Sequence, residues 1–480
     1  MSVTHHREFS ELPLTVDRGA EAPLPVQLAA SLREAIDHGT LRPGEPVPAT
    51  RELSARLGVA RGVVVAAYEQ LIAEGYLSAK HGRGTRVHPE LQGVTRTAPE
   101  PHSPGIAPSP NTAAEVTSAI VPPLAPGVPD SGALNTAAWR AAWRQAAAGA
   151  HLEAPDLGNW ALRTQIADHL RRMRGTARPA ADVIVTAGAR EGLGLLLTTL
   201  ASVRGRSLVV GVEDPGYPSL RRVAAAHGAR IVALPVDAEG LVTGSLPERQ
   251  LDVVVVTPSH QYPLGGSLPL VRRRELLDWA ALSGAVIVED DYDSELRHTG
   301  SPLPALAALD DPEQGSVVLL GTFSKTVSPA LSAGFLLAPQ ALRAHLEPVR
   351  RDLGGPVSAV VQTALAEYLA SGELRRHTAR VRRRYAARRE LVVERLLGVP
   401  GARVRAMSGG LHAVIELQRA SAEGDARLIE RCCELGAVPF AAYWQGQNAG
   451  RGLVIGTGGS LSDEQFALAL DQLRQVLLDG

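Results

Sequence analysis

The strongest constraint on the fold is an alternation, from Ala137 onward, of short β-branched apolar runs with segments of helical periodicity. Runs such as 253–256 are apolar on both faces, which is typical of strands buried between two layers of helices. Because helical segments join several of these runs, we expect a mostly parallel sheet. The expected strands are Asp182–Thr186, Ser207–Val212, Arg230–Leu234, Leu251–Val256, Ala285–Val288, Val317–Gly321 and Gly334–Leu337.

Composition divides the 480 residues into three parts, as expected for a chain too long for one core. Residues 21–89 alternate helical patterns with turns and predict a first, α+β domain. Residues 90–129 are rich in Pro, Ala, Ser and Thr and predict an extended linker. Residues 130–480 predict a second domain, with a large α/β part to about 350 and a smaller α+β subdomain over about 355–480.

The bulk composition excludes several classes of protein. With 45% hydrophobic and 21% charged residues the chain is typical of a soluble globular protein, and its net charge of -1 means that any nucleic-acid surface must be a local patch. The first 25 residues lack the apolar core of a secretion signal, and no apolar run is long enough to span a bilayer. Adjacent Cys432 and Cys433 suit a reducing compartment. We expect a cytoplasmic protein without membrane contacts.

The N-terminal part predicts a DNA-binding motif. A helix over 50–57, a tight turn at Gly58 and a second helix over 60–74 are typical of a helix-turn-helix, although helical hairpins also occur in unrelated cores. Two strands over 76–80 and 85–88 follow, joined by a glycine-rich turn and carrying basic residues without an acid. Such a hairpin can lie along DNA as a wing.

Residues Pro25–Val87 resemble the GntR-type winged helix, whose pattern stands here as PATRELSARLGVARGVVVAAYEQLIAEGYLSAKHGRGTRV. The resemblance implies DNA contacts by Arg51, Arg61, His81, Gly82 and Arg83. The chain departs from the family at Ala60, Gly62 and Val63, where hydroxyl or amide side chains are common. Each lost bidentate base contact would remove roughly 1–3 kcal/mol of discrimination.

Lysine is almost absent, with only Lys80 and Lys325 among many arginines. Arginine stays protonated and cannot form a Schiff base, so a lysine that survives in such a chain can mark a position where the amine is needed. Chance survival is the alternative. Lys325 ends the motif Gly321-Thr-Phe-Ser-Lys325 directly after an expected strand, and its hydroxyl neighbours could bind phosphate.

Three further motifs follow expected strands, where α/β sheets bind ligands. Thr186-Ala-Gly-Ala-Arg190 opens a helix whose free N–H groups suit a phosphate, although such turns also occur for packing alone. Tyr217, in a second motif over 213–218, could stack on a flat ring or be a core tyrosine. The acids of 286–293 could hold a pyridine nitrogen or a divalent metal, and the first is favoured because no second acid or histidine cluster accompanies them.

Together these motifs resemble fold-type I aminotransferases, and with the winged helix the chain is similar to the MocR subfamily of GntR regulators. The resemblance implies pyridoxal 5'-phosphate as cofactor, with Lys325 as the internal-aldimine lysine, Asp290 at the pyridine nitrogen and Tyr292 at the phenolic oxygen. It implies a phosphate site made by the main-chain N–H groups of Ala189 and Arg190, beside Ser324 and Tyr217. No metal is expected, because the histidines lack ligand spacing.

Three departures argue against efficient catalysis. Tyr262 stands where aminotransferases have asparagine, Ser332 where relatives have a phosphate-binding arginine, and Val454 where aminotransferases clamp the substrate carboxylate, although Arg451 is close in sequence. Losing one charge-assisted phosphate contact weakens binding by roughly 1.5–3 kcal/mol without abolishing it. We therefore expect cofactor binding with weak or no transaminase activity.

The expected function is a homodimeric transcription regulator whose operator binding responds to pyridoxal phosphate or to its adduct with an amine or amino acid. Genes of vitamin B6, amino-acid or amine metabolism are the targets that the family suggests. Two alternatives stay open, namely an active aminotransferase with an accessory DNA-binding domain, and a regulator that senses another ligand in a degenerate pocket. The arginines of Leu374–Arg395 predict a solvated helix face rather than a second DNA surface.

Overall fold

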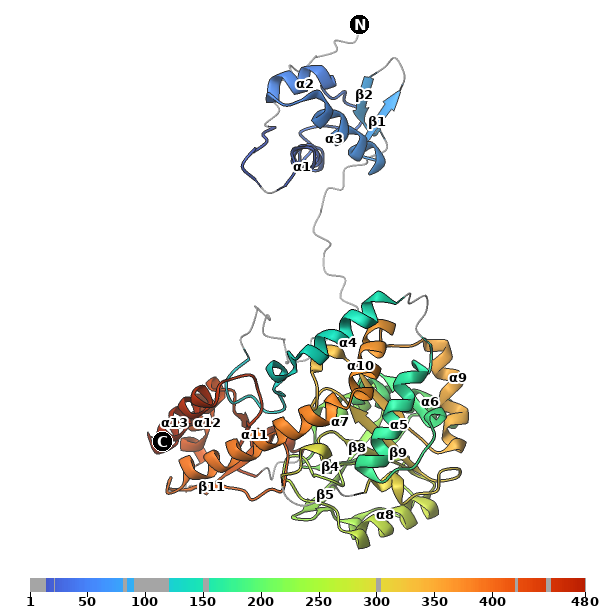
Figure 1. The fold of residues 1–480 in the computed structure, drawn as a ribbon, viewed down its shortest axis with the longest axis vertical. Helices are drawn as coiled ribbons and strands as arrows, with labels where there is room; N and C mark the ends of the chain where they lie inside the picture. Colours follow the sequence, from blue (N-terminus) through green and yellow to red (C-terminus); the bar gives the residue numbers. More distant parts are fainter. Residues whose placement is uncertain are drawn as a thin grey trace. The chain divides into compact units, whose positions relative to one another are not determined.

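The computed structural model describes residues 14–20, 22–80, 84–89, 121–149, 155–298, 304–418, 422–445 and 450–479. The chain divides into two compact units, Met1–Thr117 and Ser118–Gly480 (Figure 1). Each unit is described by itself. Within the described ranges, none of the helices combines the length and apolar character that crossing a bilayer requires.

The first unit packs three helices against a two-stranded hairpin. Its elements are α1 (Leu24–Asp37), α2 (Thr50–Leu57), α3 (Arg61–Ala73), β1 (Leu77–Lys80) and β2 (Gly84–Val87). Gly58 ends α2 with a φ of 63°, a left-handed conformation that suits glycine and turns the chain into α3. The strands are antiparallel, with Leu77 opposite Val87. The predicted helix-turn-helix and hairpin are confirmed.

One apolar core holds this unit together. All three helices and both strands contribute fully buried side chains to it, including Leu28, Leu32, Leu53, Val64, Leu71 and Val87. Tyr68 is buried among them and donates its hydroxyl to the carbonyl of Pro48 at 2.8 Å, so the buried polar group is satisfied.

The second unit is built on an eight-stranded sheet of order β3-β10-β9-β8-β7-β4-β5-β6. Strands β9, β8, β7, β4 and β5 are mutually parallel, whereas β10 is antiparallel to both β3 and β9. The carboxyl ends of β3, β4, β7, β8 and β9 therefore lie at one edge. The strands are β3 (Val183–Thr186), β4 (Val209–Asp214), β5 (Arg230–Asp237), β6 (Gly240–Leu241), β7 (Val253–Val256), β8 (Val286–Asp291), β9 (Val317–Thr322) and β10 (Gly334–Leu337).

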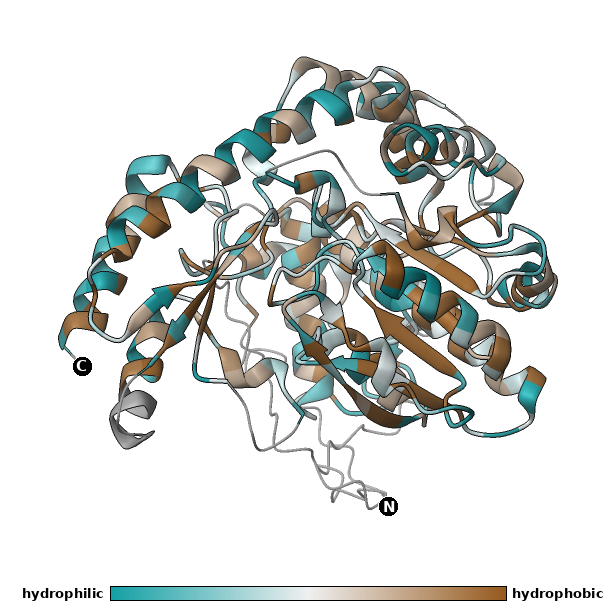
Figure 2. Cartoon of the chain, turned by 90° about the horizontal axis from the view of Figure 1, so that it is seen from below, coloured by the Kyte–Doolittle hydropathy of each residue, from teal (hydrophilic) through white to brown (hydrophobic). Residues whose placement is uncertain are grey.

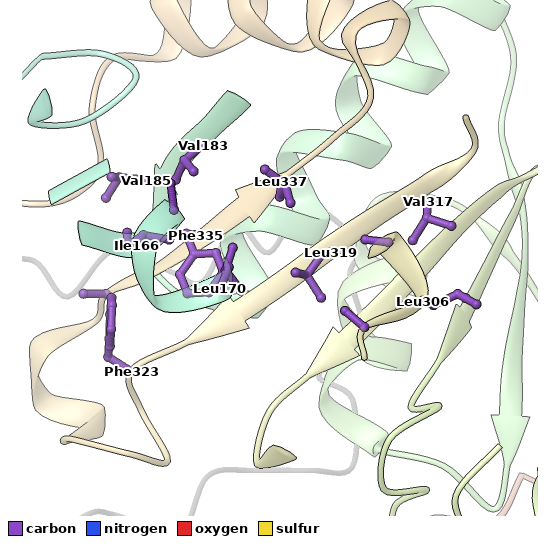
Figure 3. Packing of buried hydrophobic residues seen from close by; sticks show 14 of the residues in the cluster. Ile166, Leu170, Val183, Val185, Leu306, Val317, Leu319, Phe323, Phe335 and Leu337 are labelled. Carbon is purple, nitrogen blue, oxygen red and sulfur yellow. The ribbon is translucent and has the colours of Figure 1, made fainter. Parts of the chain in front are cut away.

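Helices cover both faces of this sheet. They are α4 (Ala137–Ala148), α5 (Trp160–Arg174), α6 (Ala189–Arg204), α7 (Pro218–Ala226), α8 (Leu270–Ser283), α9 (Gln340–Leu353) and α10 (Ala359–Ala370). Alternate strand residues enter separate cores: Val183 and Val185 join the cluster of α5, α8 and α10, and Ile184 joins that of α6, α7 and α9. Figure 2 shows the strands as brown, apolar ribbons between mixed helices, and Figure 3 shows the first cluster, where α5 meets β3, β9 and β10.

A smaller part follows, with a four-stranded antiparallel sheet of order β11-β12-β14-β13. Its elements are α11 (Glu373–Leu396), β11 (Ala402–Val404), β12 (His412–Leu417), α12 (Ala422–Glu434), β13 (Val438–Pro439), β14 (Gly452–Gly456) and α13 (Asp463–Asp479). Phe466 and Leu470 of α13 pack with Val392 of α11 and Ile415 of β12 in a third core. The predicted α/β domain with a smaller α+β part is confirmed.

Residues 121–129, which the sequence assigned to the linker, pack within the second unit and are called the strap below. Leu124 is fully buried. Its N–H donates to the carbonyl of Leu435 at 2.9 Å, and its own carbonyl accepts from the N–H of Gly456 at 2.8 Å. The carbonyl of Val128 accepts from Gly459 at 2.8 Å. Backbone hydrogen bonds, which composition does not reveal, thus attach the strap to the small sheet.

Helix α11 connects the large and small parts. Leu374, near its start, belongs to the same core as Tyr368 of α10 and the large sheet, whereas Val392 and Leu396, near its end, belong to the core of the small sheet. The sequence placed this boundary near residue 355. The structure places the change within α11, because α10 buries its apolar side chains against α4 and α5.

Several arginines of α11 are structural. Arg388 is 2% exposed and donates to the carbonyls of Gly458 at 2.6 Å and Leu461 at 2.5 Å, with Asp463 at 2.9 Å from its Nε. Arg389 is buried and donates to the carbonyl of Arg405 at 2.8 Å. The prediction of a solvated face is wrong for these residues, since their guanidinium groups satisfy carbonyls at the ends of other elements.

Candidate functional site

A cavity of about 580 Å³ opens at the carboxyl ends of the large-sheet strands and is called the first cavity. Its walls come from the start of α6, the start of α7, the loops after β8 and β9, the small part and the strap. Lys325, Tyr217, Tyr292 and Arg190 all line it. Four residues that the sequence predicted from separate motifs are therefore brought together by the parallel strands.

Lys325 lies just after β9 with its amine inside this cavity. The Nζ atom donates to the carbonyl of Gly127 in the strap at 2.7 Å. Burial lowers the pKa of the amine, an effect that the nearby carboxylates of Asp293 and Asp290 partly oppose and the charge of Arg190 reinforces. A lysine with a lowered pKa is more often neutral, which is the nucleophilic form.

Asp290 is the last buried acid of β8 and has no partner for one oxygen. Its side chain is buried, and Oδ1 forms no hydrogen bond to any described residue. Burial, together with the neighbouring charges of Asp291 and Asp293, raises the pKa of Asp290 to about 8. A buried carboxyl group with an unused acceptor can accept a hydrogen bond from a ligand or from water, because such groups are costly to bury without a partner.

The other acids of this run have protein partners. Glu289 accepts the N–H groups of Leu306 and Ala307 at 2.9 and 3.0 Å. Asp291 pairs with Nε of Arg174 at 2.7 Å. The four acids therefore do not converge on one point, and no metal-binding group of three or more His, Cys, Asp or Glu residues occurs among the described residues.

Tyr292 is held by a histidine–aspartate pair. Its hydroxyl donates to the carbonyl of His260 at 3.0 Å and lies 3.0 Å from Nδ1 of the same residue. Asp293 in turn lies 2.9 Å from that Nδ1. Burial and the charge of Asp293 raise the pKa of Tyr292 well above its usual value, so its hydroxyl stays protonated and can donate.

Aromatic rings form another wall of the first cavity. Tyr217, which caps the start of α7 and is 38% exposed, meets Tyr262 edge to face with ring centroids 5.5 Å apart. Tyr262 also packs edge to face on Tyr292 and Tyr443, at 5.6 and 5.3 Å. Tyr262, the residue expected where aminotransferases have asparagine, is therefore part of an aromatic cluster.

The start of α6 carries backbone N–H groups of the kind that bind anions. Gly188 precedes the helix with a φ of 96° and without a side-chain cap, so the first N–H groups, those of Ala189 and Arg190, have no intrahelical partner. A Cβ on Gly188 would lie 3.8 Å from the hydroxyl oxygen of Thr322, which accepts from the N–H of Ser324 at 3.1 Å. The start of α6 thus lies beside the hydroxyl of Thr322, and Arg190 lines the first cavity together with Lys325.

The structure places the other two departures outside the first cavity. Ser332 is exposed in a left-handed turn with a φ of 43° and does not line it. Val454 is fully buried in the small part, and Arg451 does not line the first cavity either. The arginines that do line it are Arg190 and Arg222.

Sequence reasoning missed several residues of this site. Gly127 of the strap, Arg222 of α7, and His412 and Tyr443 of the small part all line the first cavity. The proline-rich composition of the strap pointed to a linker, and the small part carried no motif. Burial lowers the pKa of His412 to about 3, so this histidine is neutral, and its Nε2 lies 3.0 Å from the carbonyl of Pro263.

In the first unit, Arg51 and Arg61 lie in the first turns of α2 and α3, and both are exposed. Nε of Arg61 donates to the hydroxyl of Thr50 at 3.3 Å, which draws its guanidinium to the start of α2. Ala60 caps α3 without a side-chain hydrogen bond, consistent with its departure from the family pattern. The other three predicted DNA-contacting residues, His81, Gly82 and Arg83, lie outside the described residues.

Comparison with known proteins decides the family. Residues 24–87 match the family described as bacterial regulatory proteins, gntR family, and residues 121–438 match aminotransferase class I and II. The HTH-type pyridoxine biosynthesis transcriptional regulator PdxR of Corynebacterium glutamicum is 44% identical over 98% of each chain. The chain belongs to the MocR-type regulators of the GntR family. It is thus an HTH-type transcriptional regulator with an aminotransferase-like domain.

Another regulator and several solved aminotransferase structures are also similar to this MocR-type chain. The probable rhizopine catabolism regulatory protein MocR of Rhizobium meliloti is 32% identical, over 79% of this chain and 78% of its own. Among solved structures, Pyrococcus horikoshii kynurenine aminotransferase superposes with a TM-score of 0.64 at 23% identity, covering 74% of this chain and 90% of its own. The α-aminoadipate aminotransferase LysN of Thermus thermophilus gives 0.62 at 26%, covering 74% and 91%. The second unit has the aminotransferase fold.

Proposed function

We propose that this MocR-type regulator binds pyridoxal 5'-phosphate in the first cavity and that this binding controls its affinity for operator DNA. One observation carries the proposal: an amine with a lowered pKa, Lys325, and a buried carboxyl group with an unused acceptor, Asp290, share the edge of one sheet. Pyridoxal phosphate supplies an aldehyde that condenses with amines and a pyridine ring that withdraws electrons when protonated.

The residues present fit this group. Lys325 is the amine available to the aldehyde, and Oδ1 of Asp290 is the free acceptor for a ring N–H. Tyr292 keeps its proton and can donate it to a phenolic oxygen in place of the carbonyl of His260, while Tyr217, which is 38% exposed, offers a ring face for stacking. The N–H groups of Ala189 and Arg190, with Ser324 close by, suit the phosphate. LysN, which shares the fold, was solved with a phosphopyridoxyl-leucine adduct.

Regulation without efficient transamination is the function that this cavity supports. The position of the substrate-carboxylate clamp is Val454, which is fully buried in an apolar cluster with Tyr262 and Tyr443. No charge can be supplied to a substrate carboxylate from there. Binding energy can therefore hold the cofactor, or an amine adduct of it, while a substrate carboxylate is poorly oriented.

The target and assembly are proposed from the relatives. Because PdxR is named a regulator of pyridoxine biosynthesis and is 44% identical over nearly the whole chain, we propose vitamin B6 genes as targets. A homodimer would present two winged helices to paired half-sites. Pyridoxal phosphate can alter operator affinity only if it binds unequally to two arrangements of this dimer.

Visible absorption of the purified chain tests the proposal. Pyridoxal phosphate should produce a new band in the wild type that the Lys325→Ala variant lacks, and borohydride followed by peptide mapping should label Lys325. Operator affinity should then change with the cofactor in the wild type alone. Identical spectra in the two proteins would contradict cofactor binding at Lys325 and favour a regulator that senses another ligand. Rapid release of a ketoacid from an amino acid would instead identify an active aminotransferase.

A further inference from the structure

A second cavity, of about 510 Å³, lies between helix α5 and the start of helix α11. None of its lining residues lines the first cavity. One face of each helix forms its walls. Asp168, His169 and Arg172 line it from α5, and Arg375, Thr378 and Arg382 line it from α11, all at the three- or four-residue spacing of a helix face.

The acids that line this cavity already have partners. Asp168 pairs with Arg171 at 2.6 Å and lies 3.8 Å from Arg172. Glu295 pairs with Nε2 of His169 at 2.5 Å. Although burial lowers it, the pKa of His169 is raised overall by the charge and hydrogen bond of Glu295. Asp168 and Oε1 of Glu295 are therefore paired within the α5 wall and the loop after β8, and Oε2 of Glu295 is the one carboxylate oxygen of this lining without a partner among the described residues.

The α11 wall carries positive charge without compensation. Arg375 and Arg382 both line the cavity. Among the described residues, the α11 arginines that form ion pairs are others, namely Arg376, Arg384, Arg388 and Arg395. Arg375 and Arg382 lie two turns apart on one helix face and oppose Arg172 across the cavity. Because Arg172 lies 3.8 Å from Asp168, the uncompensated charge is that of the two α11 arginines, and two such charges on one wall favour a bound anion.

The same wall has an unused hydroxyl and a helix start. Thr378 is 5% exposed and lines the cavity, yet its Oγ1 has no hydrogen-bond partner among the described residues. Gly372 precedes the 24-residue helix α11 without a side-chain cap and also lines the cavity. The N–H of Glu373, in the first turn of α11, already donates to the hydroxyl of Ser371 at 3.4 Å, so the buried hydroxyl of Thr378 is the unused donor of this wall.

We propose that the second cavity is a binding site for a small dianion of the phosphate class, held by Arg375, Arg382 and the hydroxyl of Thr378. Guanidinium groups present two parallel N–H donors, which match the oxygens of a phosphate. The site is concave, and one of its donors is buried, so a small molecule reaches it more readily than the backbone of a nucleic acid. The site is independent of the proposed cofactor.

Calorimetric titration of the full chain with inorganic phosphate, at constant ionic strength and with saturating pyridoxal phosphate present, tests this site. The wild type should bind phosphate saturably. The double variant Arg375→Ala/Arg382→Ala should bind at least about tenfold more weakly, as expected when charge-assisted contacts are lost. Thr378→Val should weaken binding, and Thr378→Ser, which retains the hydroxyl, should restore it.

The matched control is Arg380→Ala/Arg383→Ala, which removes the same charge from the same helix at residues that do not line the cavity. This control should bind phosphate as the wild type does, and circular dichroism should show all variants folded. Equal weakening in both double variants, or unchanged phosphate binding in Arg375→Ala/Arg382→Ala, would overturn the proposal. Loss of operator affinity in that variant with phosphate binding unchanged would instead assign these arginines to DNA.

Discussion

At the scale of single residues, burial moves two groups toward their neutral forms: Lys325, which lines the first cavity, and Asp290, which is buried near it at the end of β8. It lowers the pKa of the Lys325 amine and raises the pKa of Asp290 to about 8. Both shifts have the same main cause, the loss of water around a charge at the end of a buried strand. A neutral amine can condense with an aldehyde. The carboxyl group of Asp290 can pair with a cationic ring nitrogen once its proton has passed to that nitrogen.

Asp290 makes the stability of the cofactor-free chain depend on pH. Its carboxyl pKa is about 8 in the folded chain and about 4 when unfolded, so the folded state binds the extra proton between these values. Stability from this group is complete below pH 4 and is lost as pH rises toward 8. Asp290→Asn removes this loss. The variant's melting temperature, relative to the wild type, should therefore rise from pH 5 to pH 8, and a constant difference would contradict the assignment.

The same substitution, Asp290→Asn, should also weaken the binding of pyridoxal phosphate. Asparagine cannot carry the negative charge that stabilises a protonated ring nitrogen, so Asp290→Asn should bind pyridoxal phosphate more weakly by about tenfold or more, measured by absorbance titration. Asp291→Asn is a poor control because Asp291 pairs with buried Arg174. The control is Asp311→Asn, because Asp311 is exposed and does not line the first cavity. This variant should bind pyridoxal phosphate as the wild type does.

At the scale of elements, helix α11 and the strap are joined by polar contacts. The N–H of Asp130, the residue directly after the strap, donates to the hydroxyl oxygen of buried Tyr385 at 2.7 Å. Arg384 forms an ion pair with the carboxylate of Asp130. These contacts fix the segment that places the carbonyl of Gly127 against Lys325.

Tyr385→Phe isolates one of these contacts. The ring still fills its buried position, but the N–H of Asp130 loses its acceptor, so the free energy of unfolding should fall by about 1–3 kcal/mol. Urea denaturation of the two proteins measures this difference. An unchanged midpoint would show that the strap is held without this hydrogen bond.

The variant Arg61→Ala tests whether helix α3 contacts operator DNA. Arg61→Ala should weaken operator binding, and if the side chain contacts a phosphate, the slope of affinity against salt should fall by about 1. Fluorescence anisotropy at several salt concentrations measures both quantities. The visible absorption with pyridoxal phosphate should stay unchanged, because Arg61 lies in the other unit. Wild-type affinity in this variant would contradict a DNA contact by α3.

At the scale of the whole molecule, each unit has a core of its own. The core of the first unit draws only on residues between Leu14 and Val87, and those of the second unit begin at Leu124. Neither unit needs the other to bury its apolar residues. The proposed control of operator binding by the first cavity therefore requires both units on one chain, whereas the proposed cofactor binding should not.

A fragment over 121–480 should fold and keep the absorption band of the full chain with pyridoxal phosphate. It should not bind operator DNA specifically. A fragment over 14–89 should bind DNA without any response to the cofactor. A spectrum altered in the larger fragment would show that the first unit contributes to the cofactor site.

Much of the site was predictable because its chemically active residues lie in short sequence motifs. Lys325, Asp290 and Tyr217 each follow an expected strand, and a parallel sheet brings the carboxyl ends of such strands together whatever their order in the chain. The strap was not predictable, because its attachment depends on backbone hydrogen bonds to β14 and to the residues after α12. The arginines of α11 were misread for the same reason, since their acceptors are carbonyls far along the sequence.

The sequence by itself determined the two domain types, the strand edge that carries the first cavity, and the lysine at its centre, because periodicity and motif chemistry are local properties. Only the tertiary structure decided which acid of 289–293 lacks a partner, that the strap closes over Lys325, and that α5 and α11 enclose a second cavity. Those facts depend on what lies beside each residue in space, and burial, which shifts each pKa, exists only in the folded chain.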